Sequence, residues 1–134
     1  MPDTVRSDCP LCQWSDDSDQ RLVCRNDVTL FLQNSREQGA LVGSGVIIPI
    51  RHADTVFDLT IDEVNASFQL LQEVKRWMEA TYEPHGYNVG WNCGTVGGQV
   101  VMHAHMHVIP RFAQEPYAGR GIRHWLKQDA NRWQ

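Results

Sequence analysis

The sequence lacks the features that mark membrane, secreted and nucleic-acid-binding proteins. No stretch of its 134 residues approaches the roughly 18 consecutive apolar residues of a membrane span. Residues 1–4 do not begin a basic segment followed by an apolar one, so no secretory signal is expected. The formal net charge is −4 and the basic residues are scattered, which argues against a nucleic-acid polymer as partner. We therefore expect a cytoplasmic protein that binds neither membranes nor nucleic-acid chains.

Cysteine is scarce: the chain has four, of which Cys9 and Cys12 form a Cys-x-x-Cys pair. Without a secretory signal, free thiols or metal ligands are expected rather than disulfides. A Cys-x-x-Cys pair is half of a zinc site and needs two further ligands. A redox pair or two free thiols are the alternatives, but the βαβ context of redox pairs is not visible here. The residues that can complete a metal site are Cys24, Cys93, His52, His85, His103 and His124.

The composition, with 42% hydrophobic and 21% charged residues, is typical of a globular protein and predicts a single domain over residues 1–134. Thr60 and Glu63 form a capping-box pattern followed by apolar residues at helical spacing, which predicts one long helix over about 60–82. The tail over 113–134 is expected to be partly helical. Strands are predicted over 22–25, 28–33, 46–50 and 87–91. Strands on both sides of one helix favour an α+β fold with an antiparallel sheet.

His103, His105 and His107 alternate with apolar residues in the run 99–111, which predicts a strand. Side chains in a strand alternate between faces, so the three histidines would share one face and the opposite face would be entirely apolar. A single histidine in a strand is most often an ordinary packed residue. Three in phase indicate metal binding, proton transfer or nucleophilic attack. The side chains on that face would be those of Gln99, Val101, His103, His105, His107, Ile109 and Arg111.

A glycine-rich loop over 92–98 precedes the histidines. Glycines let backbone amides approach an anion closely, so Gly94, Gly97 and Gly98 can form a phosphate cradle. The loop contains neither a Walker sequence nor the dinucleotide-binding Gly-x-Gly-x-x-Gly. By itself it is typical of a plain turn, and its position beside Gln99 and the histidines is what favours phosphate binding.

His103-x-His105-x-His107, preceded by Gly97-Gly98-Gln99, resembles the histidine-triad (HIT) nucleotide hydrolases and transferases. The segments over 43–49, 57–60, 87–90 and 109–111 are similar to the same family, so the resemblance covers roughly residues 9–112. It implies a HIT-like fold with a five-stranded antiparallel sheet, one long helix and a short C-terminal helical tail. It also implies a homodimer whose tail reaches the partner's active site; a tail packed on its own core is the alternative.

The resemblance implies that His105 attacks the α-phosphorus of a nucleotide derivative and forms a covalent nucleotidyl-histidine. The main-chain oxygen of His103 would fix the tautomer of His105, and His107 would donate to a phosphoryl oxygen. Gln99 would stabilise the charge that develops in the transition state.

The nucleotide pocket is also inferred from the resemblance. The residue expected to bind the ribose is Asn34 or Gln33, of which we favour Asn34, and Phe31 and Ile48 are candidates for contacts with the base. The full set of substrate-binding candidates is Asn34, Ser44, Asn92, Gly97, Gly98 and Arg111.

For the metal, the similarity to galactose-1-phosphate uridylyltransferases within the family implies that His52 and His103 join Cys9 and Cys12. Four protein ligands leave no open position on zinc, so this zinc would be structural rather than catalytic. No organic cofactor is expected.

Two residues depart from the family pattern. Ser44 stands where the family often has a histidine, and Val100 stands where its phosphoramidase branch has a hydroxyl near the leaving group. The loss of that hydroxyl favours a leaving group that departs as a phosphate anion, so dinucleoside polyphosphates are the expected substrates. A nucleotidyltransferase or phosphorylase that uses the same His105, and a non-catalytic nucleotide-binding regulatory protein, are the alternatives.

Overall fold

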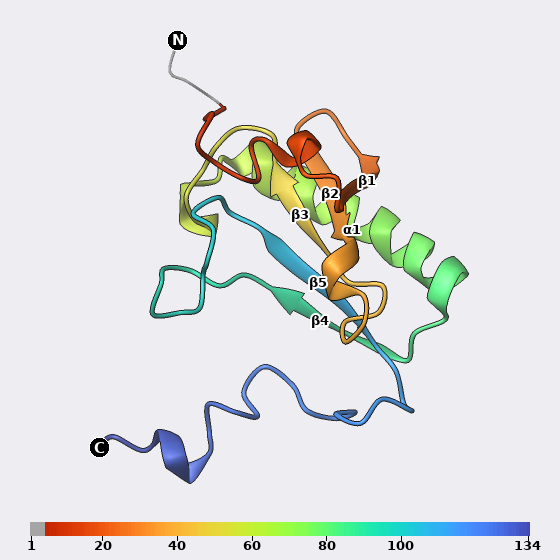
Figure 1. Cartoon of the computed structure of the whole chain (residues 1–134), viewed down its shortest axis with the longest axis vertical. Helices are drawn as coiled ribbons and strands as arrows, with labels where there is room; N and C mark the ends of the chain where they lie inside the picture. The colour runs from red at the N-terminus through yellow and green to blue at the C-terminus, as the bar shows by residue number, and fades with distance from the viewer. Residues whose placement is uncertain (1–4) are drawn as a thin grey trace.

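Residues 5–134 are described by a computed structural model, in which five antiparallel strands form one sheet and a single α-helix packs on it (Figure 1). Residues 1–4, considered above for a secretory signal, lie outside the described part. The strand order is β1-β2-β3-β5-β4. The elements are β1 (Gln20–Arg25), β2 (Thr29–Asn34), β3 (Gly45–Pro49), α1 (Ile61–Tyr82), β4 (Gly86–Gly90) and β5 (Met106–Arg111). Short 3-10 helices span Trp14–Asp16, Ser35–Glu37, Val56–Asp58 and Asp129–Asn131. The predicted α+β fold is confirmed.

The β1–β2 hairpin turns at Asn26, whose side-chain oxygen accepts hydrogen bonds from the main-chain nitrogen of Thr29 at 2.8 Å and from its hydroxyl at 2.7 Å. Asparagine stabilises such turns because its short side chain replaces a backbone partner. The first four predicted strands are confirmed, with boundaries that differ from the expected ones by no more than two residues.

Helix α1 begins where its capping box predicts. The Thr60 hydroxyl accepts from the Glu63 main-chain nitrogen at 3.1 Å, and the Glu63 carboxylate accepts from the Thr60 nitrogen at 2.8 Å. The helix ends at Tyr82 because Glu83 adopts a left-handed conformation, with φ of 53°, just before Pro84.

The two faces of the sheet are covered by different parts of the chain. Helix α1 covers one face, where the core consists of Phe31, Ile47, Leu70, Val74, Met78, Met106 and Val108. One end of the opposite face is covered by the N-terminal segment, in which Cys9 and Leu11 pack against Leu32 and Ile48. The rest of this second face is free of helix and carries the histidine side chains described below.

The histidine strand is shorter than predicted, because β5 begins only at Met106. Upstream, the His103 nitrogen donates to the Val101 oxygen at 2.9 Å, and the Ala104 nitrogen donates across to the Ala53 oxygen at 2.7 Å. Residues 101–103 form a bend, and pairing with β3 begins only at Met106. The strand predicted over 99–111 is therefore wrong over 99–105.

The tail beyond β5 consists mainly of turns and runs back below β4 in the view of Figure 1. Within residues 5–134, its helical structure is limited to the single 3-10 turn Asp129–Asn131. Gly119, with φ of 87°, adopts a conformation that interrupts a helix. Across the described chain, no helix combines the length and apolar character needed to cross a membrane.

Candidate active site

The backbone of His103 fixes the orientation of the His105 ring. The Nδ1 atom of His105 lies 2.7 Å from the His103 main-chain oxygen, as expected from the sequence. Because a carbonyl oxygen can only accept, Nδ1 carries the proton, and Nε2 of the neutral ring holds a lone pair. An imidazole in this state is a nucleophile.

His107 lies beside this ring. The centroids of the two rings are 4.9 Å apart, with an angle of 66° between the ring planes. Burial lowers the pKa of His107, and the neighbouring His105 lowers it further. Its Nε2 atom is buried and has no hydrogen-bond partner within residues 5–134. A buried polar atom without a partner is costly, so a ligand that reaches this nitrogen would be favoured.

A cavity of about 620 Å³ opens beside the two rings. Its lining brings together six of the residues that the sequence predicts for catalysis or substrate binding: Asn34, Ser44, Asn92, Gly98, His105 and His107. They come from the end of β2, the residue before β3, the glycine-rich loop, and the residues just before and at the start of β5. The Asn34 side-chain oxygen accepts from the Arg36 nitrogen at 2.9 Å, which orients the side chain, and its amide nitrogen has no acceptor within residues 5–134.

The Gln99 side chain does not lie where stabilisation of the transition state, its predicted role, would require. Its side chain is 2% exposed and binds main-chain atoms: the amide nitrogen donates to the oxygens of Asp54 (2.6 Å) and Val101 (3.0 Å), and the side-chain oxygen accepts from the Gly94 nitrogen (2.9 Å). All of its polar atoms are thus occupied. The side chain fixes the glycine-rich loop rather than facing the imidazoles.

The glycine-rich loop uses its own amides internally. The nitrogens of Gly97 and Gln99 donate to the Gly94 oxygen, and the nitrogen of Gly98 donates to the Thr95 oxygen. These amides are therefore not free to bind a phosphate in this conformation. Gly97 is required for another reason, because a side chain there would begin 2.5 Å from the Cys93 oxygen.

Arg111 lies on the same sheet face as His107 but is bound to the tail. Its Nε atom donates to the Glu115 carboxylate at 2.9 Å, and its terminal nitrogens bind the side chain of Asn88 and the main-chain oxygens of Tyr117 and Arg120. It does not line the cavity beside His105. Its guanidinium holds the tail, which leaves it little capacity for a substrate.

The apolar part of the cavity was missed from the sequence. Leu32 and Val46 line it; Leu32 lies two residues before Asn34 on β2, and Val46 lies two residues after Ser44, which directly precedes β3. Period-two alternation from those residues could have found them. Phe31, proposed for the base, points to the opposite face and is fully buried in the core under α1.

Ile48 faces the correct side of the sheet but is covered by the N-terminal segment. That segment itself contributes Pro10, Leu11 and Gln13 to the cavity. Its Cys-x-x-Cys pair predicted a metal site, but nothing in its sequence pattern indicated contact with a nucleotide.

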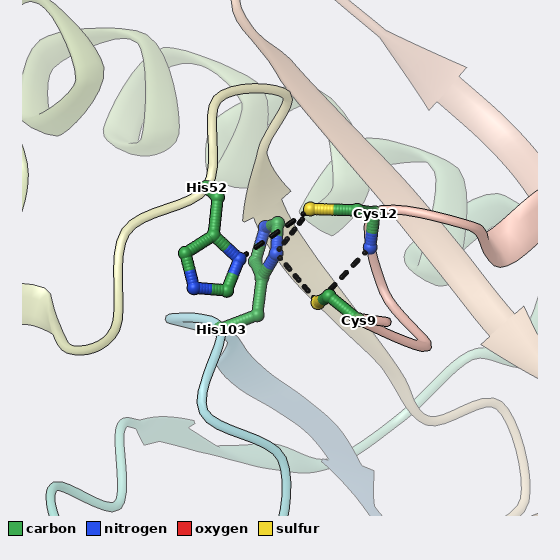
Figure 2. Close-up of side chains that lie close together, drawn as sticks. All are labelled: Cys9, Cys12, His52 and His103. Atoms are coloured by element: carbon green, nitrogen blue, oxygen red, sulfur yellow. Dashed lines mark hydrogen bonds between the residues drawn. The ribbon is translucent and has the colours of Figure 1, made fainter. Parts of the chain in front are cut away.

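The predicted metal ligands Cys9, Cys12, His52 and His103 converge from three distant parts of the chain (Figure 2). Their ligand atoms all lie within 4.8 Å of one another. The His103 Nδ1 atom is 3.4 Å from each sulfur, and the His52 Nδ1 atom is 3.4 Å from the Cys12 sulfur. With zinc bonds of about 2.3 Å to sulfur and about 2.0 Å to nitrogen, a tetrahedral site separates these atom types by about 3.5 Å. The donor set fits zinc.

Outer contacts hold these ligands in place. His103 Nε2 lies 2.9 Å from the Pro49 oxygen and His52 Nε2 lies 2.8 Å from the Asp54 carboxylate, so both rings can present Nδ1 to a metal. The Cys12 nitrogen donates to the Cys9 sulfur at 3.3 Å, which holds the Cys-x-x-Cys turn together. Burial lowers the pKa of His103 to about 4, so its ring is neutral at pH 7 and able to act as a ligand.

Comparison with known proteins agrees with this architecture. AP-4-A phosphorylase of Mycobacterium tuberculosis is 37% identical over 71 residues, which are 52% of this chain and 36% of the relative. The asymmetrical bis(5'-nucleosyl)-tetraphosphatase of Schizosaccharomyces pombe is 34% identical over 71 residues, 53% of this chain and 39% of the relative. The chain thus spans well under two thirds of the length of these relatives.

The crystal structure of SMU.412c from Streptococcus mutans UA159 has a TM-score of 0.77 at 25% identity, covering 98% of this chain and 82% of that one. Residues 17–114, which contain all five strands, helix α1 and the three histidines of the triad, match the model of the HIT domain family. The chain therefore belongs to the HIT domain family.

Proposed function

We propose that this protein is a nucleotide hydrolase that cleaves dinucleoside polyphosphates at the α-phosphate through a covalent nucleotidyl-His105 intermediate. The observation that carries the proposal is the hydrogen bond from His105 Nδ1 to the His103 oxygen, which leaves the Nε2 lone pair free beside a cavity of about 620 Å³. The names of the tetraphosphatase and phosphorylase relatives support this substrate class.

In the first step, the His105 Nε2 lone pair forms a bond to the α-phosphorus while the bond to the leaving phosphate oxygen breaks. The leaving group departs as an anion, so no proton donor is needed, in keeping with Val100 in place of a hydroxyl. The proton stays on Nδ1, and its hydrogen bond to the His103 oxygen stabilises the positive charge of the imidazolium intermediate. His107, beside the reacting ring, would donate to a non-bridging oxygen.

In the second step, a water oxygen attacks the same phosphorus, the phosphorus–nitrogen bond breaks, and the water proton passes to solvent. The electron pair of the broken bond returns to His105 Nε2, which regenerates the enzyme and releases the nucleoside monophosphate. During both steps, Asn34 would bind the ribose through its free amide nitrogen, and Ser44 and Asn92 would contact the phosphate region from the cavity wall.

The Cys9, Cys12, His52 and His103 cluster would hold a structural zinc. Four protein donors fill a tetrahedral shell, so this metal would have no position for water or substrate. Its part in the function would be to anchor the N-terminal segment that lines the cavity and the backbone of His103.

We further propose that the protein acts as a homodimer. Strand β4 is at an edge of the sheet, with main-chain groups available to pair with a second copy. The side chains of Ile61 and Phe68 on α1 and of Val89 on β4 are exposed, and the Phe68 ring lies 6.2 Å from that of Trp91, the residue after β4. Sedimentation velocity would show a species of twice 15.3 kDa, and a monomer at micromolar concentration would contradict the dimer.

The hydrolase is tested with diadenosine tetraphosphate as substrate and anion-exchange chromatography of the products. Wild type and the control His85→Ala should release AMP and ATP, because His85 lies outside the cavity. His105→Ala should lower the rate at least about a thousandfold. Nucleotide binding without turnover in wild type would contradict the enzyme and favour the regulatory alternative.

A phosphorylase is a second candidate, supported by the 37% identity to AP-4-A phosphorylase. It would use inorganic phosphate instead of water to release the nucleotide from His105. Repeating the reaction with inorganic phosphate separates the two, because ADP would then appear in place of AMP.

A further inference from the structure

A second cavity, of about 640 Å³, lies next to the cavity that holds His105. Ile109 lines it, and Ile109 follows His107 by two residues on the same face of β5, a separation of about 7 Å. On the opposite wall, Glu37 lines the first cavity and Gly39 lines the second. The two cavities therefore follow one another along the exposed face of the sheet.

The far wall of the second cavity is the C-terminal tail, and the tail is fixed there. Arg111, in the cavity floor, binds Glu115 and the main-chain oxygens of Tyr117 and Arg120. Further along, the Ile122 side chain comes within 4.0 Å of the point where a side chain on Gly90 would begin. The wall is thus built from specific contacts with the chain's own sheet.

Arg120 is the unusual residue of this wall. Its guanidinium lies 4.4 Å from the centroid of the Tyr117 ring and 5.4 Å from that of Trp125. Glu115, the carboxylate of the cavity, is already bound to Arg111. In the part of the chain that the structure describes, the Arg120 guanidinium has no hydrogen-bond acceptor and no ion-pair partner. A half-buried guanidinium stacked on two aromatic rings and lacking an anion indicates an anionic ligand with an aromatic group.

The charges that line the two cavities indicate that a polyphosphate bound beside His105 extends toward the second cavity. The lining of the first cavity includes Asp16, Asp17 and Glu37 against Arg36, and Arg36 already binds Asp17 at 2.9 Å and Asp19 at 2.7 Å. Phosphates are disfavoured beside these carboxylates. The second cavity has one excess positive charge, that of Arg120.

We propose that the second cavity binds the leaving half of a dinucleoside polyphosphate, with Arg120 contacting its phosphates and Trp125 stacking on its base. This inference rests on the proposed function, because it takes the first nucleotide to be bound beside His105. The tail residues Arg120 and Trp125 are then the residues that select a substrate with a second nucleoside.

The test compares two ligands by isothermal titration calorimetry: AMP, and a diadenosine tetraphosphate analogue whose bridging oxygens are replaced by methylene groups. Trp125→Ala and Arg120→Gln should each raise the Kd of the analogue about tenfold, because stacking and a charged contact are lost. Neither should change the Kd of AMP. The matched control is Trp133→Ala, an exposed tail tryptophan outside the second cavity, which should change neither Kd.

Equal weakening of both ligands, or an unchanged Kd of the analogue in both variants, would overturn the second subsite while leaving the hydrolase intact. Failure of wild type to bind AMP would contradict the proposed function and the subsite together. Rescue by Trp125→Phe, which keeps a ring for stacking, would support a base as the occupant.

Discussion

His105 donates its Nδ1 hydrogen to the main-chain oxygen of His103, and the ring of that same His103 lies 3.4 Å from the sulfurs of Cys9 and Cys12. One residue therefore belongs to two sites: its side chain completes the candidate metal cluster and its backbone orients the candidate nucleophile. A change in the cluster is therefore expected to move the His103 carbonyl that orients His105. Loss of the metal should lower the activity by this route.

Replacing Cys12 tests this connection. Cys12→Ser should lower the zinc content of purified protein from about one equivalent to below about half, since a hydroxyl is a poor zinc ligand. Without the metal, the N-terminal segment is no longer anchored. A resulting decrease of about 2 kcal/mol in the free energy of unfolding would lower the Tm by about 6 °C. The control is Cys24→Ser, a β1 residue outside the cluster, which should keep its zinc. An unchanged metal content in Cys12→Ser, measured by elemental analysis, would contradict the metal site.

Gln99 tests whether a buried amide positions the loop or acts on substrate. Gln99→Leu leaves the main-chain oxygens of Asp54 and Val101 without their partner and should lower the free energy of unfolding by about 1–3 kcal/mol. It should lower kcat in parallel, because the glycine-rich loop loses its support. Asn92→Ala, an exposed residue of the cavity wall, should lower activity with little change in Tm. A Gln99→Leu protein as stable as wild type but inactive would instead favour direct action on substrate.

The parts of the fold that the sequence predicts correctly are those determined by local chemistry. The capping box of Thr60 and Glu63 sets the start of α1, and the strands predicted over 22–25 and 28–33 form a hairpin that the Asn26 side chain closes locally. The four metal ligands were predicted through the resemblance to a known family. Spacing along the chain gives no indication that His52 and Cys12 meet.

The errors come from contacts between distant segments. Period-two alternation was extended through 99–105, but residues 101–103 form a bend and the Ala104 nitrogen pairs with the Ala53 oxygen rather than with a neighbouring strand. Arg111 lies on the predicted face, yet Glu115 four residues later binds its guanidinium. Alternation assigns a side chain to a face of the sheet, but the partner of that side chain depends on what else packs there.

Glu63 joins the start of α1 to the segment that carries His52. Its carboxylate accepts from Arg51 Nε at 3.0 Å and from a terminal Arg51 nitrogen at 2.8 Å, while Arg51 also donates to the His52 oxygen at 3.2 Å. Burial alone would raise the pKa of Glu63, but the hydrogen bonds from Arg51 and from the Thr60 nitrogen outweigh it and lower the pKa.

Because the pKa of Glu63 is lower in the folded state than its unfolded value of about 4.3, ionised Glu63 stabilises the fold above that value, and this stability is lost as the pH falls through the folded pKa. Glu63→Gln should therefore lower the free energy of unfolding by about 2 kcal/mol at pH 7, and the difference from wild type should shrink below about pH 4. Urea unfolding at both pH values measures it. Asp62→Asn, exposed in the same helical turn, should change stability by less than about 1 kcal/mol. If the difference in the free energy of unfolding between Glu63→Gln and wild type stayed the same at low pH, the ion pair with Arg51 would not be its source. Glu63 would then stabilise the fold through packing.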